Sequence, residues 1–219
     1  MKPPVPGPLP LPIDQFHDLE LPIVESSNPW FRSHSIDHGP IFYGRNARFR
    51  FDHPLREYRV LYVAEDAFGA FVETFGQFIS IPSLPRRITS EELLIRALSE
   101  IVADRPVRLV DLTGPGLARI GADARLFAGN YNESQVWSSA LHSHPSRIDG
   151  LLYPTRHDPR RKAAAIFTEL IGWAHLSRRT WLSLGLELRN ILSEYNFSLI
   201  ESQTVPLATR KGPKQEELF

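Results

Sequence analysis

One carboxylate in this sequence stands in an unusual setting for chemistry. The stretch RVLYVAEDAFGAFVETFG, residues 59–76, changes from a strand pattern to a helix pattern, and Glu73 falls on the helix. Glutamates on helices are usually solvated surface residues. Here Phe71 and Phe75 flank the carboxylate, and apolar surroundings tend to raise the pKa of a carboxyl group. The pattern leaves two interpretations, a surface side chain or a carboxylate held at the lip of a cleft.

The eight histidines do not form a recognisable metal-binding pattern. His142 and His144 are two residues apart, a spacing that points them to different faces of a helix. The sequence has no H-E-x-x-H motif and no cysteine, so the common zinc-binding patterns are missing. We therefore expect no metal.

Phosphate-binding loops and serine-nucleophile motifs are also missing. There is no G-x-G-x-x-G, no G-x-x-x-x-G-K-S/T and no G-x-S-x-G. A basic run, RHDPRRK, extends from Arg156 to Lys162. It is either a solvated loop or a segment that steers an anionic ligand.

Composition narrows the class of protein. The 219 residues are 42% hydrophobic and 23% charged, which suits one globular domain. The 25 basic and 25 acidic side chains balance, so global charge does not favour nucleic acid or an anionic membrane. No apolar run approaches the length of a membrane span, and the N-terminus lacks the apolar core of a signal peptide. We therefore expect a cytoplasmic protein.

The chain divides into a leader, a folded domain and a tail. Six prolines fall within residues 1–12, which predicts an extended, flexible leader. The folded domain is expected over residues 13–208. Residues 209–219, at the polar C-terminus, are expected to form a mobile tail.

Strand and helix patterns alternate through the folded part. WFRSHS and YRVLYVAE read as strands, and Asp66 is placed to cap a helix over residues 67–78. Residues 89–103 give the clearest helix pattern, because Thr89 and Glu92 fit a capping box before an apolar stripe.

The second half continues the alternation. VRLVDLTG predicts a strand, NESQVWSSALHSHP a helix, DGLLYPTR and KAAAIFTE two partner strands, and TWLSLGLELRNILSEY a late helix. No regular βαβ repeat is present. These patterns predict an α+β fold in a single mixed domain.

Three of these blocks together resemble the RES-domain family, which is named for its Arg, Glu and Ser. The blocks are WFRSHS with FYGRNARFRFDHP, then YRVLYVAEDAFGAFVETFG, then SQVWSSALHSHPSRIDGLLYPTRHDP. The resemblance runs from about Pro29 to Phe167. It implies an ADP-ribosyltransferase-like fold, with residues 13–208 as a RES-like catalytic domain that consumes NAD as its substrate.

The family's functional residues map onto positions of this chain. The arginine falls on Arg32, the glutamate on Glu73 and the tyrosine of the L-Y-x-A strand on Tyr62. Thr155 stands where the family has serine; its hydroxyl is a candidate for hydrogen-bonding the ligand, although its β-branch restricts the rotamers. Arg48, in the loop before the strand, is a second candidate for binding phosphate.

The resemblance implies cleavage of the nicotinamide–ribose bond. That reaction passes through an oxocarbenium-like state, which a fixed carboxylate such as Glu73 would stabilise. Arg32 has the forked donors that suit a pyrophosphate. Tyr62 offers a ring for nicotinamide and a hydroxyl group. Hydrolysis, phosphorolysis and ADP-ribosyl transfer all stay open.

The resemblance also implies a biological role. RES proteins are known as toxins that pair with an Xre-type helix-turn-helix antitoxin, so any contact with DNA would come through that partner. A homo-oligomer within the complex stays open. The alternative is a non-catalytic binding module that keeps the fold, suggested by Thr155 and by the proline-rich leader. Growth arrest on expression without a partner would separate the two.

Overall fold

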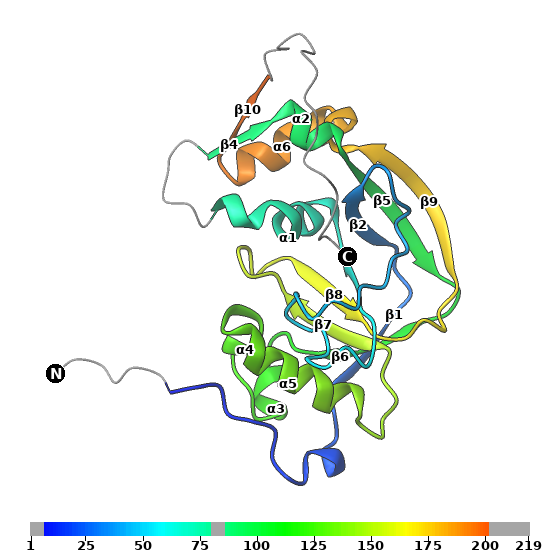
Figure 1. The fold of residues 1–219 in the computed structure, drawn as a ribbon, viewed down its shortest axis with the longest axis vertical. Helices are drawn as coiled ribbons and strands as arrows, with labels where there is room; N and C mark the ends of the chain where they lie inside the picture. Colours follow the sequence, from blue (N-terminus) through cyan, green and yellow to red (C-terminus); the bar gives the residue numbers. More distant parts are fainter. Residues whose placement is uncertain (1–6, 80–85, 202–219) are drawn as a thin grey trace, which may run out of the picture.

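The fold is built around one curved sheet. The computed structural model describes residues 7–79 and 86–201 (Figure 1). Within them, eight strands form a sheet in the order β1-β6-β7-β8-β3-β2-β5-β9, antiparallel except for β6 and β7. The strands are β1 Ile23–Ser26, β2 Trp30–Ser35, β3 Leu61–Ala64, β5 Arg96–Ala103, β6 Val107–Asp111, β7 Gly150–Pro154, β8 Lys162–Ile166 and β9 Trp173–Thr180.

The helices lie in two groups along this sheet. Figure 1 shows α1, α2 and α6 toward one end, together with the small parallel pair β4 and β10, and α3, α4 and α5 toward the other. The helices are α1 Ala67–Ile79, α2 Ser90–Leu94, α3 Gly116–Arg119, α4 Arg125–Ala128, α5 Tyr131–His142 and α6 Leu186–Glu194; the pair is β4 Arg86–Thr89 and β10 Phe197–Ile200. Two 3₁₀ turns cover Phe16–Asp18 and Trp181–Leu184.

Alternation along the strands divides the core between the two faces of the sheet. On β3, Leu61 and Val63 join one apolar cluster with Trp30. Tyr62 and Ala64 face the other, larger cluster, which includes Phe71 and Phe75 of α1. Side chains of a strand alternate between faces, so the apolar run of β3 serves both sides of a central strand. The predicted α+β class in a single mixed domain is confirmed.

Most of the local predictions are confirmed. The expected strands at 30–35 and in YRVLYVAE are β2 and β3. The Asp66 carboxylate accepts the backbone N–H of Gly69 at 2.7 Å, at the start of α1. Thr89 and Glu92 form the reciprocal capping box of α2.

The helix predicted over residues 89–103 is wrong beyond its first turn. Only Ser90–Leu94 is helical, and Arg96–Ala103 is the strand β5. This strand pairs with β2 on one side and β9 on the other. Its leucine, isoleucine and alanine residues fit either a helical stripe or a strand buried in a sheet, and the two neighbouring strands determine the outcome.

The late helix is shorter than predicted and is preceded by an unexpected strand. Residues 173–180 form β9, and Trp181–Leu184 is a 3₁₀ turn. Gly185 then has a φ of 61°, a left-handed conformation that glycine adopts without the steric cost of a Cβ. It separates the 3₁₀ turn from α6. The apolar pattern that predicted one continuous helix therefore belongs to two elements, the turn and α6.

The described part of the proline-rich segment packs on the domain. Leu9 is 2% exposed and belongs to the larger core cluster. The indole N–H of Trp137 on α5 donates to the carbonyl oxygen of Pro10 at 2.7 Å. Ordered packing therefore extends to residues that were expected to be flexible, because Leu9 enters the core and the Leu9 amide and Pro10 carbonyl both form hydrogen bonds with α5. Residues 1–6 and the predicted tail at 209–219 lie outside the described residues.

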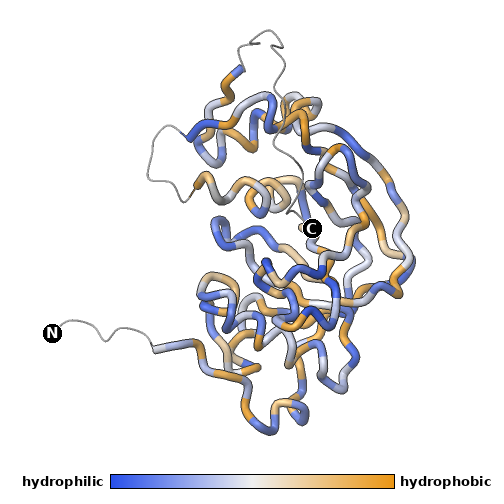
Figure 2. Tube along the Cα trace, in the orientation of Figure 1, coloured by the Kyte–Doolittle hydropathy of each residue, from blue (hydrophilic) through white to orange (hydrophobic). Residues whose placement is uncertain are grey.

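Hydropathy follows this arrangement. Figure 2 shows a mainly hydrophobic α1 and a hydrophilic loop between β7 and β8 opposite it. The outer strand β9 is also largely hydrophilic in Figure 2. Over residues 7–79 and 86–201, none of the helices combines the length and apolarity that crossing a membrane would need.

Candidate functional site

A cleft lies between the two groups of helices. Its volume is about 740 Å³, within the usual range for ligand pockets. α1 lines one side, the loop at 49–50 with α4 and α5 lines another, and strands β2, β3 and β7 contribute their side chains. Figure 1 shows where α1 and the α4–α5 pair, which both contribute lining residues, lie relative to the sheet.

Glu73 projects from α1 into this cleft. Its side chain is exposed to solvent within the cavity that it lines. The Tyr153 hydroxyl on β7 donates to its Oε2 at 3.3 Å. Burial raises the pKa of Glu73 above 4.5, against the opposing effects of Tyr153 and the Arg50 charge. The helix position therefore holds a carboxylate at a cleft, one of the two interpretations that the sequence allowed.

Arg32 lines the same cleft where two strands diverge. β2 and β3 pair only through Phe31 and Ala64, so the Tyr62 carbonyl is available to Arg32, whose Nη1 donates to it at 3.3 Å. The Nε atom of Arg32 is buried without a hydrogen-bond partner among the described residues. Burial lowers the pKa of Arg32 to about 10, so the guanidinium remains charged at neutral pH.

Tyr62 reaches the cleft, but its hydroxyl group is already engaged. The hydroxyl donates to Oδ1 of Asp52 at 3.0 Å and accepts the backbone N–H of Phe51 at 3.0 Å. Oδ2 of Asp52, which is 2% exposed, accepts the backbone N–H groups of Arg48 and Phe49. The structure therefore leaves the ring of Tyr62, more than its hydroxyl, for contact with a ligand.

Arg50 is a cleft residue that the sequence prediction missed. It is 8% exposed, and its Nη1 donates to the Gly129 carbonyl at 2.9 Å and to the Ser134 hydroxyl at 3.1 Å. Its guanidinium carbon lies 4.4 Å from the centre of the Tyr131 ring. Burial lowers the pKa of Arg50. The signal available in the sequence was its place between Phe49 and Phe51, within the block FYGRNARFRFDHP.

A buried polar face of α5 fixes the loop that carries Arg50. The Gln135 amide donates to the carbonyl oxygens of Ala47 and Phe49, at 3.1 and 3.0 Å. The Ser138 hydroxyl donates to the Phe51 carbonyl at 2.7 Å. Ala47 has a φ of 56°, which is unfavourable for a residue with a Cβ. Hydrogen bonds from one helix thus hold the wall of the cleft.

Two predicted site residues lie outside the cleft lining. Thr155 is fully buried, and its hydroxyl donates to the Asp158 carbonyl at 2.8 Å. It therefore stabilises its own turn, where we had expected it to contact a ligand. Arg48 is exposed and does not line the cavity. Two residues further along the loop, Arg50 does line the cavity.

The residues of the basic run at 156–162 have different surroundings, because some form ion pairs and others line the cleft. Arg160 pairs with Asp158 and Glu194, and Arg161 pairs with Asp66. Only the start of the run, Arg156 and His157, lines the cleft. The solvated-loop interpretation therefore fits the exposed Arg160, whereas Arg161 is partly buried and packs over the Phe68 ring. Arg156 is the arginine of the run that could still steer an anionic ligand into the cleft.

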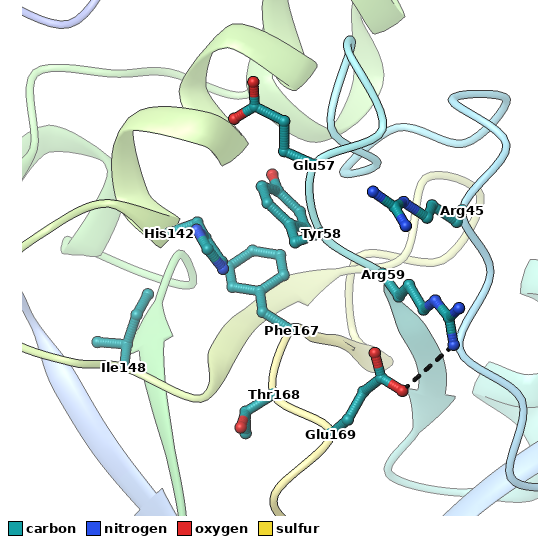
Figure 3. Close-up of a pocket in the computed structure, with 9 residues that line it drawn as sticks. All are labelled: Arg45, Glu57, Tyr58, Arg59, His142, Ile148, Phe167, Thr168 and Glu169. Atoms are coloured by element: carbon teal, nitrogen blue, oxygen red, sulfur yellow. Dashed lines mark hydrogen bonds and ion pairs between the residues drawn. The ribbon is translucent and has the colours of Figure 1, made fainter.

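A second cavity lies at the opposite end of β3. Its volume is about 470 Å³ (Figure 3). Figure 3 shows Tyr58, His142 and Phe167 together on one side, with Tyr58 and His142 stacked at 4.0 Å between ring centres. Arg59 faces Glu169 across the cavity at 3.5 Å. Glu73, Arg32 and Tyr62 are all absent from the lining, so the candidate site is the larger cleft.

Metal-ligating side chains do not gather in the part of the chain that the structure describes. No group of three or more histidine, aspartate or glutamate side chains is placed to hold an ion there. His144 is buried, and its ring is occupied by the Phe16 carbonyl and the Ser146 amide.

Comparison with known proteins shows the family. The sequence matches the RES domain family over residues 25–181, more than half of its 219 residues. A similar fold occurs in the crystal structure of the M. tuberculosis MbcT–MbcA toxin–antitoxin complex, with a TM-score of 0.60 and 19% identity over 80% of this chain and 96% of that chain. No curated protein matches the sequence significantly. The chain belongs to the RES domain family.

Proposed function

We propose that this protein is an NAD-consuming toxin that cleaves the nicotinamide–ribose bond. The observation that carries the proposal is Glu73, a carboxylate that lines a cleft together with Arg32, Arg50 and three tyrosine rings. Membership of the RES domain family supports it. Such an enzyme would act in the cytoplasm and would need no metal.

The proposed chemistry places the carboxylate beside a developing positive charge. As the nicotinamide leaves, the ribose becomes oxocarbenium-like, and a fixed negative charge lowers the energy of that state. Glu73 would stabilise it, or orient the attacking group, from α1. The ring of Tyr62 offers a surface for stacking on nicotinamide. Arg32 would bind the pyrophosphate.

Incubation with labelled NAD tests the proposal and separates three outcomes. The purified protein is incubated with NAD alone, with phosphate, and with cell lysate. Free ADP-ribose indicates hydrolysis, a phosphorylated ADP-ribose indicates phosphorolysis, and label on protein indicates transfer. Intact NAD in all three conditions would contradict the enzyme proposal and favour the binding module.

Replacing Arg32 with lysine is expected to weaken NAD binding by about 10-fold, with thermal stability near wild type. Lysine keeps the charge but loses the planar fork that matches a pyrophosphate. Calorimetric titration with NAD and a melting curve give the two readouts. Unchanged affinity combined with a large fall in melting temperature would show that Arg32 is structural.

Replacing Tyr153 with phenylalanine is expected to move the acid limb of the pH–rate profile upward. Burial raises the pKa of Glu73 above 4.5, and the hydrogen bond from Tyr153 lowers it. Removing that bond raises the pKa further, so the active carboxylate is lost at a higher pH as the pH falls. The measurement is kcat/KM for NAD against pH.

The control for this variant is Tyr195→Phe. The Tyr195 hydroxyl also donates to a carboxylate, that of Asp158 at 3.1 Å, but Tyr195 does not line the cleft. The acid limb of the pH–rate profile of Tyr195→Phe should coincide with that of the wild-type protein. An unchanged limb in Tyr153→Phe would remove Tyr153 from the control of Glu73.

We also propose that an antitoxin neutralises the protein. The similar fold of MbcT occurs in a complex with the antitoxin MbcA. An Xre-type partner would bring any DNA contact, and an assembly with several copies of this chain stays open. Expression without a partner should arrest growth. Growth at the wild-type rate, with the protein folded and present, would favour the non-catalytic binding module.

A further inference from the structure

A buried arginine in the cleft has no carboxylate partner. Arg50 is 8% exposed, and it forms no ion pair with any described residue. Removing a cation from water is costly unless an anion compensates it. The carbonyl and hydroxyl that bind Arg50 are neutral, so these hydrogen bonds do not compensate its charge.

The hydrogen bonds of Arg50 use only one of its three nitrogens. Nη1 makes both contacts, to Gly129 and Ser134. Nε and Nη2 have no partner among the described residues, and neither belongs to the fully buried atoms that lack one. These two nitrogens therefore keep access to the cleft that Arg50 lines. Their parallel N–H groups form the edge of a guanidinium that binds an oxyanion through two hydrogen bonds.

Ser134 and Tyr131 hold the Arg50 guanidinium, and with it the Nε–Nη2 edge, in place. Ser134 is fully buried on α5, and its hydroxyl donates to the Leu126 carbonyl at 2.7 Å. The Tyr131 ring lies against the guanidinium at 4.4 Å from its carbon. A side chain fixed in this way loses little entropy when it binds, which favours affinity for an anion of matching shape.

The charge balance of the cleft also favours an anion. Four arginines line it, against the single carboxylate of Glu73: Arg32, Arg50, Arg96 and Arg156. The charge of Arg156 acts on Arg50 unfavourably and that of Glu73 favourably. An anion placed between the arginines would gain from the cations, while repulsion would keep it away from Glu73.

We propose that Arg50 binds a phosphoryl oxyanion in the cleft through its Nε–Nη2 edge. The proposal rests on the proposed function, because it assigns a binding residue to the same site. Two sources share the chemistry, the pyrophosphate of a dinucleotide substrate and free orthophosphate. Tetrahedral phosphoryl oxygens match the spacing of the two N–H groups in both cases.

Binding measurements with Arg50→Lys and Arg50→Gln test this. Lysine can still donate to Gly129 and Ser134 but lacks the two-nitrogen edge, whereas glutamine also removes the charge. The probes are ADP, orthophosphate and adenosine, titrated by calorimetry. Arg189→Gln is the matched control, because Arg189 is exposed on α6 and outside the cleft lining.

Both Arg50 variants are expected to bind one phosphorylated probe about 10- to 100-fold more weakly, the range for losing hydrogen bonds to a charged group. Weaker ADP binding alone identifies the pyrophosphate as the source, and weaker orthophosphate binding alone identifies the free anion. Adenosine binding should not change. Wild-type affinity for both anions in a folded Arg50→Lys would overturn the proposal.

A measurement on the wild-type protein covers the case in which both variants fail to fold. The ¹⁵Nε resonance of Arg50 should shift when ADP or orthophosphate is added and stay in place with adenosine. No shift with either anion would overturn the proposal. Because none of these readouts requires turnover, their failure is distinct from failure of NAD cleavage, which the labelled-NAD incubation measures.

Discussion

Replacing Glu73 with glutamine is expected to reduce NAD turnover by about 100-fold or more, the scale of losing one preorganised electrostatic group. The amide keeps the size of the side chain and can still accept from Tyr153, but it cannot oppose the positive charge on the ribose. Folding should survive, because burial disfavours the charged form of Glu73, and a neutral amide avoids that cost.

Turnover by single-turnover kinetics and unfolding by circular dichroism should be measured together. Glu169→Gln provides the control, since Glu169 is a half-exposed glutamate in the second cavity, paired with Arg59. It should turn NAD over at the wild-type rate. A folded Glu73→Gln protein with wild-type turnover would contradict the proposed role of the carboxylate.

Replacing Gly150 with alanine is expected to destabilise the fold by about 3 kcal/mol or more. Gly150 begins β7, and a Cβ there would lie 2.2 Å from the backbone carbonyl oxygen of Ala165 on β8. Because the obstacle is backbone, β7 and β8 would have to separate at the centre of the sheet, beyond the usual cost of overpacking. The melting temperature should fall by about 6–12 °C.

Gly39→Ala is the control for that prediction. A Cβ at Gly39 would meet nothing within 4 Å, and its φ lies outside the positive range. The variant should melt within about 2 °C of wild type. If Gly150→Ala melted equally close to wild type, the tight approach of β7 to β8 would be wrong.

The sequence predicted elements well where local chemistry determines them. The cap at Asp66 and the capping box at Thr89 and Glu92 depend on residues within one turn, and both are confirmed. The strand Arg96–Ala103 was mistaken for a helix because its partners are distant. Trp30–Ser35 lies more than sixty residues away in sequence, and no local pattern carries that pairing.

The residues of the candidate site also differ in how far the sequence alone could identify them. Glu73, Arg32 and Tyr62, the three residues that the resemblance singles out, line one cleft. Arg50 could not be found in this way, because its role depends on Gly129 and on a serine more than eighty residues away. Its environment exists only after α5 packs against the loop, so a pattern of neighbours in the chain could not reveal it.

The buried polar face of α5 has a consequence for how this protein opens. Gln135 and Ser138 hold three carbonyls of the loop at 47–51, and Leu9 and Pro10 lie against the same helix. Hydrogen exchange should therefore report α5, this loop and the described leader as one cooperative unit, in which amides become unprotected together. A wall of the cleft would then be lost only when the helix itself detaches, so local fraying alone would not release a bound ligand.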